Sequence, residues 1–127
     1  MARVTQLLIK AENKPGTLAG ICTGLAAMAV NIQAVMAAPV TEGGIRIVAS
    51  PHATAKRVLD GLRIPYKEEE AVAVRLNDRP GALGKVTRKL AEKGINVTYA
   101  YGSIVKGDSR ALIILGVSDV EKAADLV

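Results

Sequence analysis

The chain has 127 residues, of which 50% are hydrophobic, with no Trp, no Phe and a formal charge of +5. Residues 1–64 carry seven Lys/Arg and three Asp/Glu, and residues 65–127 carry ten and nine, without a dense basic run in either half. We therefore expect no nucleic-acid partner. The single Cys22 excludes an intramolecular disulfide and fits a reducing compartment. Because the chain has no 18-residue apolar stretch and no signal-peptide pattern, we expect a soluble cytoplasmic protein without membrane association.

The first half of the chain alternates apolar runs with Pro and Gly breaks, which is typical of short strands and helices. Its expected elements are a strand at 4–11, a helix at 16–29, strands at 30–38 and 45–49 joined by a turn at 42–44, and a helix at 52–62. Pro15 suits the first turn of the first helix, where its missing N–H would be unpaired anyway. The residues expected to face inward from that helix are Leu18, Ile21, Cys22, Leu25 and Met28.

The second half follows the same plan after a short acidic patch, Glu68–Glu70, which reads as a solvated linker. Its expected elements are strands at 71–76, 95–101 and 110–116, a helix at 81–93, a turn at 106–108, and a last helix capped by Asp119. Gly94 is a natural C-cap. The residues expected to face inward from the helix at 81–93 are Leu83, Val86, Leu90 and Ala91.

An internal repeat explains why the two halves look alike. Residues 13–18 (Asn-Lys-Pro-Gly-Thr-Leu) and residues 78–83 (Asp-Arg-Pro-Gly-Ala-Leu) each open a helix pattern, and an Asn follows each Gly after 15 residues. A constant offset of 65 aligns the halves without gaps, keeping Pro, Gly and core positions in phase. A repeat of this kind sets the architecture, and it indicates duplication of one small unit.

The order of elements predicts an α+β fold made of two ferredoxin-like βαββαβ units. Each unit is an antiparallel sheet with its helices on one face. We place the units at residues 1–68 and 69–127. The second unit is expected to lack its closing strand, which leaves an open sheet edge beside residues 71–76 that the first unit, the segment 64–69 or another chain must cover.

The repeated pattern resembles the ACT domain: a strand, Asn/Asp-x-Pro-Gly-x-Leu, a helix, Gly/Ala-Ile/Val-Asn-Ile/Val and a hairpin. The resemblance covers nearly the whole chain twice, closely in the second copy and with Asn13 and Ala29 as mild departures in the first. It implies a stand-alone tandem ACT protein, similar to regulatory subunits of amino-acid biosynthesis. It also implies a non-enzymatic, allosteric regulatory role in which a small amino acid binds at the Pro-Gly loop near an ACT–ACT interface.

The two Pro-Gly loops are the candidate ligand sites. A helix N-terminus preceded by glycine offers N–H donors and a positive dipole end to a carboxylate, while Asn or Asp oxygens accept from an ammonium group. The candidate ligand-binding residues are Asn13, Pro15, Gly16, Thr17, Leu18, Asn31, Ile32, Asp78, Pro80, Gly81, Ala82, Leu83, Asn96 and Val97. In the competing interpretation, Asn13 and Asp78 only cap their helices, and Asn31 and Asn96 only shape a turn.

Catalysis has little support in the sequence, and we expect no catalytic residue, no metal site and no cofactor. His52 is interpreted as an exposed residue at a helix end, and Cys22 as a buried, inert thiol. Tyr99 and Tyr101 share one face of a strand, where packing is favoured over stacking on a nucleic-acid base.

The two halves differ in the charge of their first helices. Residues 16–29 contain no charged residue, whereas residues 81–93 carry five. A helix without a polar outer face is usually buried on more than one side, so we expect the first unit to form an interface, most simply in a homodimer. The alternative function is a ligand-free structural or regulatory-subunit module that docks on a separate biosynthetic enzyme.

Overall fold

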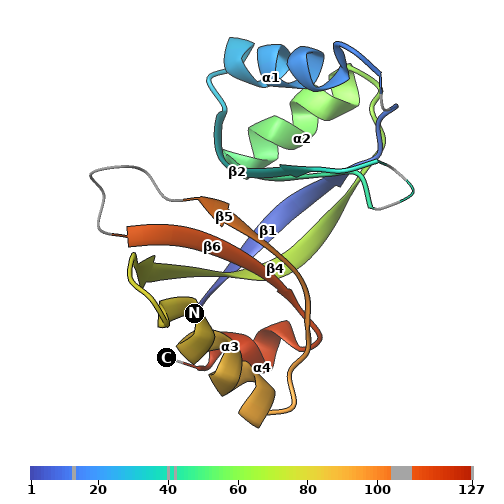
Figure 1. The fold of residues 1–127 in the computed structure, drawn as a ribbon. Coiled ribbons are helices and arrows are strands. Elements are labelled where there is room, and N and C mark those ends of the chain that lie inside the picture. The colour runs from blue at the N-terminus through green and yellow to red at the C-terminus, as the bar shows by residue number, and fades with distance from the viewer. Residues whose placement is uncertain (13, 40, 42, 104–109, 127) are drawn as a thin grey trace. The chain divides into compact units, whose positions relative to one another are not determined.

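The computed structural model describes residues 1–12, 14–39, 41, 43–103 and 110–126 (Figure 1). Its elements are β1 (Ala2–Ile9), α1 (Thr17–Ala27), β2 (Asn31–Ala37), β3 (Ile45–Ser50), α2 (His52–Gly61), β4 (Tyr66–Asn77), α3 (Ala82–Glu92), β5 (Val97–Ser103), β6 (Arg110–Val117) and α4 (Val120–Ala124). The predicted β-α-β-β-α order, present twice, is confirmed. The predicted turn at 106–108 lies outside the described residues. Within the described part of the chain, no helix is long and apolar enough to cross a membrane.

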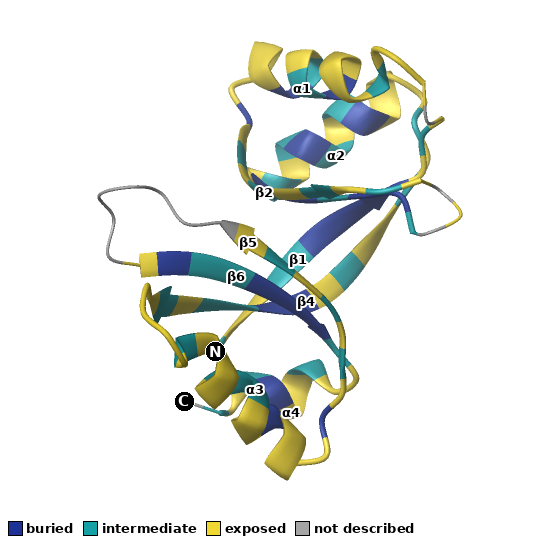
Figure 2. Ribbon diagram, viewed as in Figure 1, coloured by how far each residue is buried: buried dark blue, intermediate teal, exposed yellow. Residues whose placement is uncertain are grey.

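The chain forms two compact units, one of residues 5–69 and one of residues 1–4 together with 70–127. In the first unit the strand order is β2-β3-β1-β4, with β3 antiparallel to both β1 and β2. Helices α1 and α2 lie on one face of these strands (Figure 1). The buried core of this unit is Leu7, Ile9, Ile21, Leu25, Val30, Ile45, Ile47, Ala49, Ala55 and Leu59 (Figure 2).

The second unit has the strand order β1-β4-β6-β5, with β6 antiparallel to both β4 and β5. Its buried core is Val72, Leu90, Ile95, Leu115 and Ala123. The sheet position expected to stay open beside β4 is taken by the first residues of β1. There, Arg3 Nε donates to Glu70 Oε2 at 3.0 Å. Strands β1 and β4 therefore each supply residues to both units.

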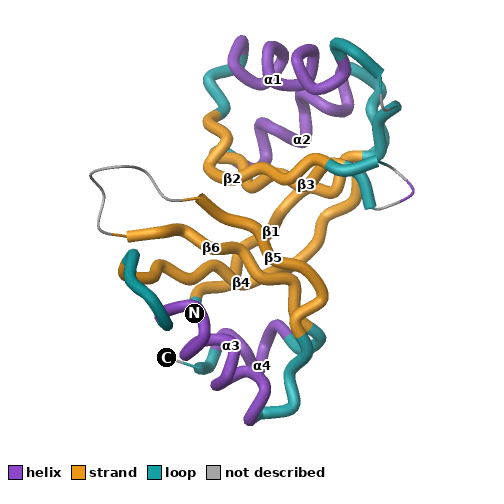
Figure 3. Tube along the Cα trace, in the orientation of Figure 1, coloured by secondary structure: helices purple, strands orange, loops and turns teal. Residues whose placement is uncertain are grey.

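Each Pro-Gly loop precedes a helix, α1 in the first unit and α3 in the second, and Figure 3 shows a loop leading into each of these helices. Gly16 and Gly81 are the N-cap residues, with left-handed φ values of 90° and 87°, and as glycines they have no side chain that could cap the helix. The expectation that Pro15 lies in the first turn of the helix is wrong, because a left-handed glycine is not helical and α1 begins only after it. Asp119 caps α4 as predicted, accepting a hydrogen bond from the Lys122 N–H at 2.9 Å.

The helices also end alike, in a left-handed residue that turns the chain back to the sheet. Gly94 has φ 72°, and the Ile95 N–H donates to the Leu90 carbonyl at 2.9 Å. In the first unit Ala29 takes the same role with φ 57°. The alanine is a departure from the usual glycine, because a Cβ makes this conformation unfavourable.

Four residues expected to face inward are exposed instead. Leu18, Leu83 and Met28 are 40%, 42% and 59% exposed, and Ala91 is also exposed. Leu18 and Leu83 lie in first turns, Met28 follows the last turn of α1, and Ala91 lies in the last turn of α3. The buried positions are Ile21 and Leu25 in α1 and Leu90 in α3, so burial reaches the last turn of each helix but not the first. Helical periodicity therefore predicts the inward side only approximately, and it does not predict how far along the helix burial extends. Cys22 is half-buried rather than buried.

Tyr99 is held against its own sheet. It pairs with Gly116 across β5 and β6, and a Cβ added to Gly116 would collide with the Tyr99 ring. The ring therefore occupies the space that a side chain at Gly116 would need. This contact favours packing over stacking on a base for Tyr99.

The acidic patch is not a solvated linker, since Glu68–Glu70 lie inside β4 and each carboxylate has a cationic partner. Glu68 Oε1 lies 2.7 Å from His52 Nε2 and 3.2 Å from Lys56 Nζ. His52 is thus a partly buried partner of this carboxylate rather than an exposed helix end. The hydrogen bond from His52, followed by the one from Lys56, lowers the pKa of Glu68.

The lowered pKa of Glu68 predicts an acid-sensitive contribution to stability. A carboxylate whose folded pKa lies below its ordinary value of 4.5 stabilises the fold above that pH and loses the effect as the pH falls through the folded pKa. At pH 7, Glu68→Gln is expected to unfold at a lower urea concentration than the wild type. This difference in urea concentration is expected to vanish below the pKa that Glu68 has in the folded protein. Urea denaturation at a series of pH values measures this. Glu92→Gln on α3 is the control, and an equal pH dependence in both variants would contradict the assignment.

Candidate functional site

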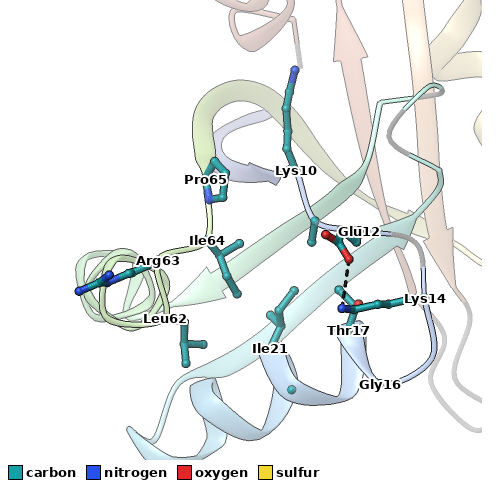
Figure 4. A pocket seen from close by; sticks show the side chains of 12 residues that line it. Lys10, Glu12, Lys14, Gly16, Thr17, Ile21, Leu62, Arg63, Ile64 and Pro65 are labelled. Atoms are coloured by element: carbon teal, nitrogen blue, oxygen red, sulfur yellow. Dashed lines mark ion pairs between the residues drawn. The ribbon is translucent and has the colours of Figure 1, made fainter.

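The first Pro-Gly loop opens onto a cavity of about 570 Å³ in the unit of residues 5–69 (Figure 4). Three segments surround it: the end of β1 with the following loop, the start of α1, and the segment after α2. The lining residues are Lys10, Ala11, Glu12, Lys14, Gly16, Thr17, Gly20, Ile21, Leu62, Arg63, Ile64 and Pro65. A cavity of this size accommodates a small metabolite.

One part of this cavity is apolar. Ile21 is only 1% exposed and belongs to the core of the unit, and Ile64 packs against that core. Leu62, in contrast, is 48% exposed beside them. Pro65 completes the wall, and its carbonyl accepts a hydrogen bond from the Lys10 N–H at 3.0 Å, which fixes this segment to the end of β1. The wall suits an aliphatic group.

The polar part carries both signs of charge. Lys14 Nζ lies 3.1 Å from Glu12 Oε2, and Figure 4 shows this pair beside Thr17. The Lys14 and Glu12 side chains are 66% and 78% exposed, so their ion pair contributes roughly 0–1 kcal/mol. A zwitterion can therefore replace it at little cost, with its carboxylate on Lys14 and its ammonium group on Glu12.

The N-terminus of α1 adds to the polar part. The first turn of a helix presents N–H groups that have no partner inside the helix, and the macrodipole makes this end positive. Thr17, the first residue of α1, lines the cavity together with Gly16. Among the described residues, and apart from its neighbours in the chain, no heavy atom lies within 4 Å of the position that a Gly16 Cβ would occupy, so a ligand can approach this backbone closely.

Residues 62–65 were missed as site residues by the sequence reasoning. They reach the cavity because Arg63 adopts a left-handed φ of 56° after α2, and the Ile64 N–H donates to the Leu59 carbonyl at 3.0 Å. The only sequence signal is the apolar Ile64-Pro65 pair, which follows α2 after Leu62 and Arg63. Neither element periodicity nor the Pro-Gly motif points to it.

The other candidate ligand residues are distributed over several places. Leu18 lines a smaller neighbouring cavity of about 220 Å³ together with Thr17, and Ala82 lines a cavity of about 260 Å³ in the second unit. The remaining described candidates line none of these three cavities; they are Pro15, Asn31, Ile32, Asp78, Pro80, Gly81, Leu83, Asn96 and Val97. Asn13 lies outside the described residues.

The candidates at the strand starts lie near the far ends of their helices. Asn31 begins β2 after the end of α1, and the 11 residues of this helix, which starts at Thr17, span about 16 Å. Ile32 and Val97 pack against the two cores, and the Asn96 N–H donates to Ser118 Oγ at 2.9 Å. Within each unit, the structure thus separates these residues from the Pro-Gly loops. Among the described residues, no group of three or more His, Cys, Asp or Glu side chains is placed to hold a metal ion.

Comparison with known proteins shows what this architecture is similar to. A family model described as an ACT domain pair matches residues 2–127. The structure of protein BT0572 from Bacteroides thetaiotaomicron is similar with a TM-score of 0.86 and 27% identity, covering 95% of this chain and 83% of that one. A comparison with curated protein sequences gave no significant match.

Two structures with lower identity share the fold. The ligand-free regulatory subunit of aspartate kinase from Thermus thermophilus has a TM-score of 0.62 and 16% identity, covering 98% of this chain and 89% of that one. Aspartokinase III from E. coli, in complex with lysine and aspartate, has a TM-score of 0.60 and 18% identity, covering 98% of this chain and 30% of that one. The repeat, the fold of each unit and the family match agree, and the chain belongs to the ACT domain family as an ACT domain pair.

Proposed function

We propose that this chain is a non-enzymatic regulatory protein of amino-acid metabolism that binds a small amino acid at the first Pro-Gly loop. The cavity of about 570 Å³ beside Gly16 and Thr17 carries the proposal, because it combines an aliphatic wall with an ion pair and a helix N-terminus. These three features match the side chain, ammonium group and carboxylate of one amino acid. The ACT fold shared with aspartate kinase regulatory subunits supports a regulatory role.

The wall further favours an amino acid with an apolar side chain. Ile21, Leu62 and Ile64 present only carbon atoms, and burying apolar ligand surface against them contributes roughly 25 cal/mol per Å². Valine, leucine, isoleucine and methionine are therefore expected to bind more tightly than aspartate or lysine. The bound ligand would change the surface near α1, and an enzyme partner or a second copy of the chain would bind this changed surface with a different affinity.

A thermal-shift screen of the twenty amino acids tests the proposal, since a ligand that binds only the folded state raises Tm by mass action. We expect the aliphatic amino acids to raise Tm, and Leu62→Asp to abolish that rise by placing a charge in the wall. Met28→Asp is the matched control, because Met28 is also exposed but does not line the cavity. Equal loss of the shift in both variants would contradict the assigned site.

The alternative is a ligand-free structural or regulatory-subunit module that docks on a separate enzyme. It is favoured by the exposed face of α1, which includes Ala19, Thr23 and Ala27 on a helix without charge. We propose that this face forms the interface, in a homodimer or against an enzyme. The absence of a thermal shift with all twenty amino acids, together with a homodimer in sedimentation equilibrium, would favour this alternative.

A further inference from the structure

The second Pro-Gly loop borders a cavity of different chemistry. It measures about 260 Å³ and lies between the end of β4, the start of β6 and helix α3. Five of its nine lining residues are basic and none is acidic. The basic residues are Arg75, Arg79, Lys85, Lys89 and Arg110.

The internal repeat shows that this charge is concentrated on the cavity itself. At the offset of 65, Lys85, Lys89 and Arg110 correspond to the uncharged Gly20, Gly24 and Ile45 of the first unit. Residues 65–127 contain ten basic and nine acidic residues, so the half as a whole is almost neutral. Half of its basic residues therefore lie around one cavity of the second unit.

The acidic partner present in the first unit is missing here. Glu12, which pairs with Lys14, corresponds to Asn77, and Lys14 corresponds to Arg79. Among the described residues, no carboxylate lies within ion-pair distance of Arg75, Arg79 or Lys85. The ammonium group of an amino acid would have no acceptor of opposite charge among these lining residues, so the cavity does not suit the zwitterion proposed for the first unit.

We propose that this cavity binds a small polyanion that carries at least two phosphate or carboxylate groups. Arginine side chains bind both groups through paired N–H donors, and several cations around one cavity favour several negative charges. Ala82, which begins α3, also lines the cavity, so the positive end of that helix adds to the attraction. The pair of ACT domains would then bind two ligands of different chemistry, a zwitterion in one unit and a polyanion in the other.

Isothermal titration of the full chain with inorganic pyrophosphate and, separately, with citrate tests this proposal at low salt. At least one anion is expected to bind, with an affinity that falls as salt increases. Arg79→Gln and Lys85→Gln are each expected to weaken binding by about tenfold or more. Binding of pyrophosphate alone assigns phosphate chemistry, and binding of citrate alone assigns carboxylate chemistry.

Arg88→Gln is the matched control, because it removes the same charge from the exposed face of α3 outside the cavity. Its affinity is expected to equal that of the wild type. The proposal is overturned if neither anion binds at low salt, or if Arg88→Gln weakens binding as much as Arg79→Gln. Leu62→Asp is expected to leave the anion affinity unchanged, which separates failure of this proposal from failure of the amino-acid site.

Discussion

Replacing Leu25 with alanine is expected to lower the free energy of unfolding by about 2–5 kcal/mol. Leu25 is completely buried in the last turn of α1 and belongs to the buried core of its unit. The substitution removes apolar surface from this core and leaves a cavity that close-packed neighbours fill only in part. Urea denaturation followed by far-UV circular dichroism measures the loss.

Leu18→Ala provides the control on the same helix with the same change in side chain. Leu18 is 40% exposed in the first turn, so its loss is expected to cost less than about 1 kcal/mol. The contrast distinguishes burial from helix propensity, because both substitutions replace leucine with a better helix former. Equal losses for the two variants would mean that the first turn of α1 is buried in solution, as it would be in a tight homodimer.

Much of the fold could be predicted from the sequence because local chemistry and the repeat agree. Glycines 65 residues apart take nearly the same left-handed φ, 90° at Gly16 and 87° at Gly81, so the two Pro-Gly motifs specify the same turn. The first and last residues of the strands were harder to predict. β4 begins at Tyr66, whereas the sequence predicted a start at residue 71 because Glu68–Glu70 have low strand propensity. In the structure, cationic partners distant in sequence stabilise these three residues in the sheet.

The candidate site was only partly predictable, for a related reason. Gly16 and Thr17 were identified because a motif and a helix start coincide in the sequence. Leu62 and Ile64 were not identified, because they reach the same cavity through the backbone turn at Arg63 and the pairing of residues 10 and 65. Residues that meet only through tertiary structure leave no periodic signal along the chain.

The last prediction concerns Gly44, which ends the turn before β3. Its φ is +97°, and an added Cβ would lie 2.6 Å from the carbonyl oxygen of Ile9. Ile9 is fully buried and pairs with Ile45, so its backbone cannot move without disturbing the β1–β3 ladder. Gly44→Ala combines an unfavourable backbone conformation with a steric collision. We expect it to lower the free energy of unfolding by about 2–3 kcal/mol.

Gly84→Ala is the matched control for the prediction at Gly44. Gly84 lies inside α3, and no heavy atom of the described residues lies within 4 Å of the position of its added Cβ, apart from its chain neighbours and the nearby backbone of α3. Alanine is the better helix former, so this variant is expected to be more stable than the wild type by up to about 1 kcal/mol. Urea denaturation of both variants measures the difference in sign. Because the chemical change is identical, opposite effects would show that backbone conformation and available space decide the outcome, whereas an unchanged stability of Gly44→Ala would contradict the assigned role of Gly44.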